Sequence, residues 1–232
     1  GGATTGFNDP RLIDTTRGTR SLYMNNTYAE GNEYGYNFLA DGIQLTNSNS
    51  AFNRTGNGYY GYMWRANGGT EVTNNDGTQT SYVQANTDTG FSMIRYTGTG
   101  NYNDTFGHGL NSAPEFVIAK SYSDVNSWGM YLNDGSNQWF GYIGHNAQTA
   151  LSTTSTQLVP NATSINAKHV GTNDNNKNYM FWAWHSVAGY SKFGSYFTNA
   201  STKIPLDFEA DFFIFKYGSN GDWYVQDVKQ YD

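Results

Sequence analysis

The sequence predicts an all-β protein, and two features of its composition carry that prediction. Aromatic residues make up 17% of the 232 residues, whereas charged residues make up only 14%. Aromatic side chains in so polar a chain suit strands, because a pleated, half-buried surface accommodates Tyr, Trp and Phe. Asn-, Asp- and Gly-rich clusters, such as 74–77 and 133–135, separate the apolar runs as turns do. We expect an antiparallel, β-sandwich-like fold with very little helix.

The clearest strand patterns are two aromatic segments of the same design. Residues 57–69 (NGYYGYMWRANGG) alternate aromatic and other side chains up to Trp64, between glycine-rich ends. Residues 178–186 (NYMFWAWHS) repeat the spacing, with Trp184 aligned on Trp64. Both segments are predicted strands, and both tryptophans are predicted core residues.

A second pair of similar phrases follows these strands. GFSMIRY at 90–96 is echoed by GYSKFGSY at 189–196, and each phrase begins with a glycine, Gly90 or Gly189. Similarity at a fixed distance is the signature of an internal repeat. We therefore expect Gly90 and Gly189 to have equivalent structural roles.

The similarity continues in two apolar runs, 113–120 (APEFVIAK) and 209–216 (EADFFIFK). Pro114 opens the first run, and Lys120 and Lys216 end the two runs at matching positions. Such lysines can extend their stems along an apolar core while the ammonium group finds polar partners. We assign Pro114 and both lysines structural roles.

Two further segments, 12–26 and 130–144, each read as two apolar strands around a Gly-containing turn, which predicts hairpins. The last repeat stops where the first begins, so Leu12 and Val225 are expected at equivalent positions in a cyclic register. Helix-permissive stretches are confined to 146–151 and 27–33, each no longer than about one turn.

These correspondences predict three regions. Residues 1–9 are expected to form a flexible leader, 10–127 a first β repeat that includes a linker at 67–89, and 128–232 a second β repeat.

The net charge of −6 and the absence of cysteine exclude several classes of function. Thirteen Lys and Arg residues, thinly spread, form no basic stripe of the kind that binds nucleic acid. No apolar run approaches the ~18 residues that span a bilayer. Without cysteine the chain has no disulfide, thiolate metal site or cysteine nucleophile. We expect neither a nucleic-acid partner nor membrane insertion.

The order of phrases in residues 10–232 resembles a repeat domain of marine bacteriophage structural proteins, particularly tail fibres. The phrases of that largely uncharacterised family are matched in sequence order by Trp64–Ala66, Gly68–Thr70, Gly90–Gly98, Gly107–Leu110 and Ala113–Lys120. The second copy departs from the pattern, with Leu206–Phe208 in place of the Gly107–Leu110 turn. The resemblance implies a virion component, with other virion subunits as partners, and supplies no mechanism.

Catalytic motifs are missing from the sequence. The four histidines have no HExxH or HxH spacing, and no nucleophile elbow, phosphate-binding loop or dinucleotide fingerprint occurs. His108, between two glycines, is predicted to be a turn residue whose imidazole binds backbone groups, and His185 a strand-face residue. Most acidic residues stand in Asn/Gly turns, and we predict no catalytic residue and no metal site. Calcium at the oxygen-rich cluster 173–176 is the one cofactor alternative.

Three tryptophans remain as candidates for ligand binding. Trp128, Trp139 and Trp223 are flanked by polar turn residues, so their indoles could stack on a sugar while amides and carboxylates bind its hydroxyls. The candidate ligand-binding residues are Trp128, Trp139, Asp134, Asn137, Trp223 and Asn220. Packing over a sheet end is the competing role for each indole.

The sequence thus favours a non-enzymatic virion protein, a tail-fibre or surface-decoration module that binds host surface glycans with low affinity and gains avidity from many copies. A homo-oligomer, such as a trimer, is expected. The alternative is a purely architectural cement or fibre subunit that acts through its interfaces. A polysaccharide depolymerase is a third reading, which needs two carboxylates roughly 5–10 Å apart in a groove.

Overall fold

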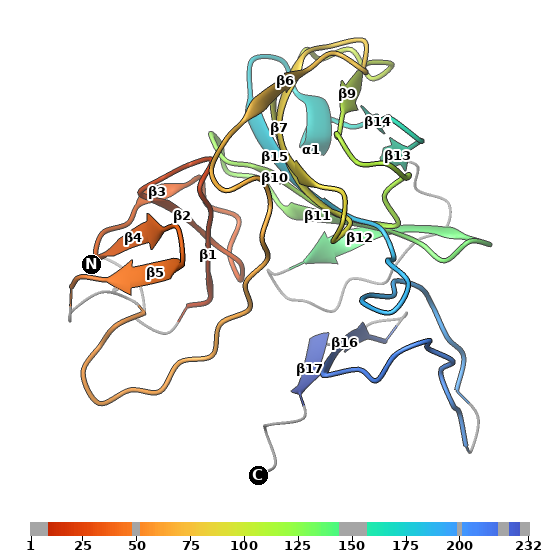
Figure 1. Ribbon diagram of the computed structural model, residues 1–232. Helices are drawn as coiled ribbons and strands as arrows, with labels where there is room; N and C mark the ends of the chain where they lie inside the picture. Colours follow the sequence, from red (N-terminus) through yellow and green to blue (C-terminus); the bar gives the residue numbers. More distant parts are fainter. Residues whose placement is uncertain (1–8, 48–51, 144–156, 199–200, 218–222, 228–232) are drawn as a thin grey trace.

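The computed structural model describes residues 9–47, 52–143, 157–198, 201–217 and 223–227 (Figure 1). These residues form an all-β structure with antiparallel sheets and one short helix, α1 (Val170–Asn173), which confirms the predicted fold class. Residues 1–8 of the expected leader lie outside the described residues.

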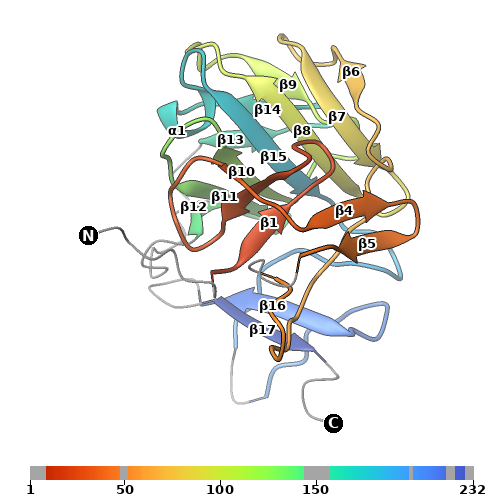
Figure 2. The ribbon, with the colours of Figure 1, turned by 90° about the vertical axis from the view of Figure 1, so that its left-hand side faces the viewer.

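A seven-stranded antiparallel sheet forms the centre of the molecule, in the order β12-β11-β10-β15-β8-β7-β6 (Figures 1 and 2). Its strands in chain order are β6 (Val72–Asn74), β7 (Ser81–Asn86), β8 (Phe91–Thr97), β10 (Phe116–Ser121), β11 (Trp128–Asn133), β12 (Gln138–Ile143) and β15 (Asn178–Trp184).

Both faces of this sheet are covered, because residues along each strand alternate between two apolar clusters. In β15, Tyr179, Phe181 and Ala183 join one cluster, whereas Met180 and Trp182 join the other. The first cluster is covered by the sheet of β9 (Thr105–Gly107), β13 (Leu158–Pro160) and β14 (Ser164–Ala167). The second is covered by the sheet of β1 (Arg11–Ile13), β2 (Arg20–Tyr23) and β3 (Gly31–Asn32).

Two separate hairpins complete the described structure. They are β4 (Tyr36–Leu39) with β5 (Gly42–Leu45), and β16 (Phe212–Lys216) with β17 (Trp223–Asp227). Figure 2 shows the β16–β17 hairpin below the central sheet, outside its layers. A two-stranded hairpin is at best marginally stable alone in water, so both hairpins depend on further contacts.

The strands do not separate into two successive units at residues 127 and 128. That boundary lies inside the β10–β11 hairpin, and β15 of the second predicted repeat is inserted between β10 and β8 of the first. The physical reason is burial, since the Trp- and Phe-rich strand β15 is apolar on both faces and is placed at the centre of the sheet.

The predicted strand at 57–69 is wrong. Residues 57–66 have no regular strand pairing, although 178–184 form β15 as predicted. Trp64 and Trp184 are not equivalent residues of two repeats: their rings contact each other edge to face, with centroids 5.7 Å apart. Trp64 remains 42% exposed, so it covers the edge of the second cluster without being part of its buried centre.

The segments that begin at Gly90 and Gly189 share one backbone feature at the glycine, and their structures then differ. Gly90 and Gly189 both have positive φ, 66° and 71°. Phe91 then begins the buried strand β8, whereas Tyr190 is an exposed turn residue beside the Val187–Ser191 bridge. The glycine similarity therefore reflects turn geometry and does not extend to equivalent strands.

Other parts of the predicted correspondence agree with the structure. The runs 113–120 and 209–216 each lead into a hairpin, β10–β11 and β16–β17, and 12–26 contains the β1–β2 hairpin. Pro114 is buried just before β10. Leu12 and Val225 do not match, because Leu12 packs on the second cluster while Val225 is 38% exposed on the outlying hairpin.

The helix lies outside the two stretches that were predicted to permit one. Residues 27–33 contain no helix, and 146–151 lie outside the described residues. α1 begins after His169, whose Nδ1 accepts a hydrogen bond from the N–H of Gly171 at 3.0 Å. Within the described ranges, no helix is long and apolar enough to cross a membrane.

Alanine substitutions at the two glycines should have unequal effects. Each substitution places a residue with a Cβ in the left-handed backbone conformation, and this strain destabilises the folded state by roughly 1–2 kcal/mol. At Gly90 a Cβ would also lie 2.6 Å from the carbonyl oxygen of His185, whereas nothing lies within 4 Å at Gly189. In urea denaturation, Gly90→Ala should therefore destabilise the protein more than Gly189→Ala. Equal losses would show that the close contact at Gly90 relaxes without cost.

Candidate functional site

Trp128, the first tryptophan proposed to bind a ligand, is a core residue. It is 1% exposed, and its ring stacks on Trp182 with centroids 5.7 Å apart. Its indole N–H donates to the backbone oxygens of Tyr23 and Asn26, at 3.0 and 2.9 Å. The prediction that Trp128 stacks on a sugar is wrong, because neither face of the ring is accessible.

Three of the predicted residues do lie together, in the turn between β11 and β12. Asp134 Oδ1 accepts the N–H of Asn137 at 2.6 Å, and Asp134 Oδ2 accepts the indole N–H of Trp139 at 3.2 Å. Ser195 Oγ donates to Asp134 Oδ2 as well. Although partial burial opposes it, the hydrogen bonds from Ser195 and from backbone N–H groups hold the pKa of Asp134 well below its usual range. The carboxylate and the indole N–H therefore bind each other, which favours a turn-stabilising role.

The remaining predicted pair is not brought to this turn. Trp223 is half-buried at the start of β17, and its Nε1 has no hydrogen-bond partner in the described part of the chain. Asn220 lies outside the described residues. Trp223 belongs to the outlying hairpin, so the six predicted residues do not form one site.

The matched lysines differ in their surroundings. Lys120 is fully buried, and its Nζ donates to the backbone oxygens of Ser121, Thr27 and Asp124 at 2.6, 3.3 and 3.3 Å. Burial lowers the pKa of Lys120 to about 8. Lys216 is only partly buried. Lys120 thus ties the segment after β2 to the central sheet, which agrees with the predicted structural role.

His108 binds backbone groups as predicted, whereas His185 lies just after the end of β15 and is not a residue of that strand. His108 is buried in the turn after β9, where Nδ1 accepts the N–H of Leu110 and Nε2 donates to the Asn161 carbonyl oxygen at 3.1 Å. Burial lowers the pKa of His108. His185 follows β15, and its ring nitrogens contact Ser186 O and Asn111 Oδ1. Both imidazoles are occupied by local hydrogen bonds.

The oxygen-rich cluster 173–176 does not converge on a common point. The side chain of Asn173 accepts the N–H of Thr99 and donates to the carbonyl oxygen of Asn101. Asp174 Oδ1 accepts the N–H of Asn175. Across the described residues, no group of three or more His, Asp or Glu side chains is placed to hold a metal ion.

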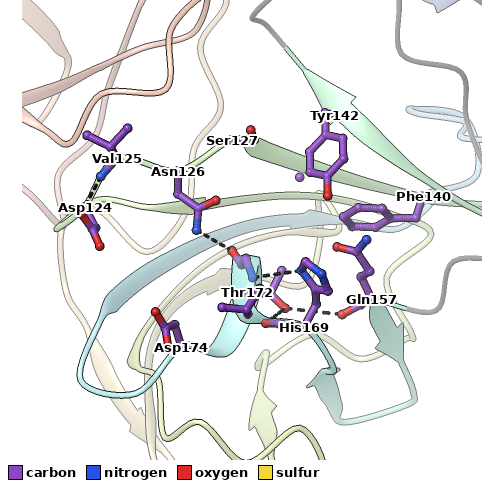
Figure 3. Close-up of a pocket in the computed structure, with 13 residues that line it drawn as sticks. Asp124, Val125, Asn126, Ser127, Phe140, Tyr142, Gln157, His169, Thr172 and Asp174 are labelled. Atoms are coloured by element: carbon purple, nitrogen blue, oxygen red, sulfur yellow. Dashed lines mark hydrogen bonds between the residues drawn. The ribbon is translucent and has the colours of Figure 1, made fainter.

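A pocket of about 260 Å³ lies between β12, the loop after β10 and α1 (Figure 3). Its walls combine two aromatic rings from β12 with amide, imidazole and carboxylate groups from loops. The lining residues are Asp124, Val125, Asn126, Ser127, Gly129, Phe140, Tyr142, Gln157, His169, Val170, Gly171, Thr172 and Asp174. Sequence reasoning missed this pocket because its residues come from four separate stretches with no shared motif.

A second unusual surface is the β16–β17 hairpin, which exposes apolar side chains on both faces. Phe212, Ile214 and Val225 lie on one face, and Phe213 and Tyr224 on the other, each between 38% and 50% exposed. Phe215 stacks on Tyr224 and Phe213, with centroids about 5 Å apart. In a single chain the hairpin therefore leaves an aromatic ladder in contact with water.

Comparison with known proteins places the chain in a family. The match covers residues 3–232 and is to a domain of unknown function, DUF7483. The chain belongs to the DUF7483 family. No curated protein and no solved structure matches the chain. For this DUF7483 protein, inferences about activity therefore rest on its own residues.

Proposed function

We propose that this DUF7483 protein is a non-enzymatic structural component of a bacteriophage virion, a tail-fibre or decoration module that acts through contacts with other subunits. The resemblance of its phrase order to marine phage structural proteins supports a place on the particle. Its low charge and abundant Asn, Thr, Ser and Tyr also suit a protein that stays folded outside a cell. The partners in this proposal are other virion subunits and further copies of the chain.

The observation that carries the proposal is the uncovered β16–β17 hairpin. A monomer has no reason to keep Phe, Ile, Val and Tyr side chains about 40–50% exposed on both faces of one hairpin. Contiguous apolar surface of this kind marks interaction sites. Tyr196 extends the surface, since its ring lies 5.9 Å from that of Phe213.

The size of this surface agrees with an interface. If each aromatic side chain has ~200 Å² to bury, the exposed fractions of Phe212, Phe213, Tyr217, Tyr224 and Tyr196 leave roughly 500 Å². Ile214 and Val225 add to it. A stable interface buries about 800 Å² per partner, so the two faces of the hairpin together supply more than half of that area.

Sedimentation velocity on the full chain tests this proposal. We expect a concentration-dependent oligomer, such as a trimer, and its dissociation by the double variant Phe213→Ser and Tyr224→Ser. The central sheet lies elsewhere, so near-ultraviolet circular dichroism should show the variant still folded. Tyr60→Ser, which removes an 84% exposed tyrosine outside the hairpin, is the control.

A chain that stays monomeric at high concentration, or a double variant that assembles as the natural chain does, would contradict a role for this hairpin. Mass spectrometry of purified virions tests the location on the particle, where the chain should occur in many copies.

A further inference from the structure

The pocket beside α1 has an aromatic wall that is open on one side. Phe140 and Tyr142 lie on the same face of β12, with ring centroids 5.5 Å apart and planes at 87°. The residue opposite Tyr142 on the neighbouring strand β11 is Gly129, which has no side chain. The Phe140 ring fills the space that a side chain at position 129 would occupy, since its Cζ would lie 3.2 Å from a Cβ there. Tyr142 is only partly buried and lines the pocket, so part of its ring is available to a ligand.

The opposite wall presents a neutral hydrogen-bond donor. His169 Nδ1 accepts the N–H of Gly171, so a neutral His169 carries its proton on Nε2. Burial lowers the pKa of His169, which favours this neutral form. In Figure 3 the hydroxyl end of Tyr142 points toward the side of the pocket on which Phe140 and His169 lie. Among the described residues Nε2 has no hydrogen-bond partner, so it is available as a donor.

Acceptors lie beside this donor. Asn126 Nδ2 donates to the Gly171 carbonyl oxygen at 3.2 Å, which fixes the amide and leaves Oδ1 as an acceptor. Asp174 supplies a carboxylate and Gln157 a second amide on the rim. Donor, acceptors and aromatic face thus converge within one pocket, as they do in small-ligand sites.

The charge of the lining indicates the class of ligand. Among the described residues no Lys or Arg lines the pocket, and the carboxylates of Asp124 and Asp174 disfavour an anion. Lys177 is held by Asp124, with Nζ and Oδ2 2.7 Å apart. The volume of about 260 Å³ lies just below the ~300 Å³ at which drug-sized sites begin. A neutral, polyhydroxylated ring of one or two units satisfies all of these conditions.

We propose that this pocket binds a neutral saccharide unit. The C–H face of the sugar packs on Tyr142, His169 Nε2–H donates to a sugar oxygen, and Asn126 Oδ1 and the Asp174 carboxylate accept hydroxyl hydrogens. The proposal places the expected glycan binding in this pocket, and not at the turn between β11 and β12 where Asp134 binds Trp139. It does not depend on assembly through the β16–β17 hairpin.

Backbone amide NMR titrations with the methyl glycosides of glucose, galactose, mannose and N-acetylglucosamine provide the test. Shifts should concentrate at 124–129, 140–142 and 169–174 for at least one glycoside. Tyr142→Ala should weaken that binding about tenfold, equivalent to about 1.4 kcal/mol. His169→Asn retains an acceptor for the Gly171 N–H but loses the Nε2 donor, and should weaken binding several-fold without unfolding α1. Tyr60→Ala, outside the pocket, should bind as the natural chain does.

The association-deficient variant Phe213→Ser and Tyr224→Ser separates this proposal from the one above, because saccharide binding should survive in it. The proposal is overturned if none of the four glycosides shifts the pocket residues. It is equally overturned if Tyr142→Ala and His169→Asn both bind with unchanged affinity, or if only sulfated or phosphorylated sugars bind.

Discussion

Trp128→Ala should destabilise the protein by about 3–5 kcal/mol, as large-to-small substitutions of buried aromatic residues do. The substitution removes the ring that stacks on Trp182 and leaves a cavity between the central sheet and β1–β2. It also removes the donor shared by the carbonyl oxygens of Tyr23 and Asn26. The loss is therefore larger than that expected from apolar area alone.

Urea denaturation followed by circular dichroism measures this effect, with Trp128→Phe and Trp139→Ala as comparisons. Trp128→Phe keeps most of the apolar contact and loses the N–H, so it should fall between Trp128→Ala and the natural chain. Trp139→Ala affects only a half-buried residue at the start of β12 and should cost less. A Trp128→Ala protein with unchanged stability would contradict the burial described above. Reduced glycan binding by Trp128→Ala would reflect lost stability and would not identify a sugar site.

Arg17→Ala should be of similar severity, about 3–5 kcal/mol, because it breaks a buried ion pair by removing one partner. Arg17 and Asp14 side chains are 2% and 4% exposed, with Nη2 and Oδ2 2.6 Å apart. The guanidinium also donates to the Leu12 carbonyl oxygen and lies 3.7 Å from Glu30. Desolvation already raises the pKa of Glu30, and Arg17 opposes that shift. Without Arg17, the buried Asp14 loses its counter-ion, and the partly buried Glu30 keeps only the weaker attraction of Arg20.

Thermal or urea unfolding of Arg17→Ala, with the exposed Arg20→Ala as the matched control, checks this expectation. Arg20→Ala should change stability by less than about 0.5 kcal/mol. Adding Asp14→Asn to Arg17→Ala should recover part of the loss, because it removes one unpaired charge. If Arg17→Ala and Arg20→Ala are equally mild, the ion pair contributes little and the β1–β2 sheet is held by apolar contacts alone.

The two proposals concern different parts of the molecule. Assembly is argued from the outlying hairpin β16–β17, whereas saccharide binding is argued from the pocket between β12 and α1. A tail-fibre or decoration module needs both a fixed place on the particle and a surface that faces its host. Many low-affinity pockets held on one particle would act together through avidity.

Much of the secondary structure could be predicted from local sequence. The apolar runs at 116–121 and 178–184 are strands β10 and β15, and the turn between β11 and β12 stands at the predicted NDG cluster. The prediction failed at 57–66, where the same aromatic alternation gives no strand. The alternation of aromatic residues indicates that their side chains pack on the rest of the protein, and Trp64 does pack on Trp184. It cannot report whether the backbone finds a neighbouring strand.

The candidate site was predicted less well than the strands, and Trp128 shows why. Its polar neighbours in sequence suggested an exposed indole, but its neighbours in space are Tyr23 and Asn26, about a hundred positions away. The pocket residues likewise come from 124–129, 140–142, Gln157 and 169–174. No local sequence pattern predicts these long-range contacts, because each contact depends on which strands pair.

The sequence by itself determined the all-β class, the β1–β2 and β11–β12 hairpins and the scarcity of helix, since side-chain alternation and turn chemistry act over a few residues. Only the tertiary structure decided that β15 lies between β8 and β10, that Trp128 and Arg17 are buried, and that β16–β17 is left uncovered. Strand order and burial depend on contacts between residues far apart in the chain, and the free energy of those contacts is shared across the whole sheet.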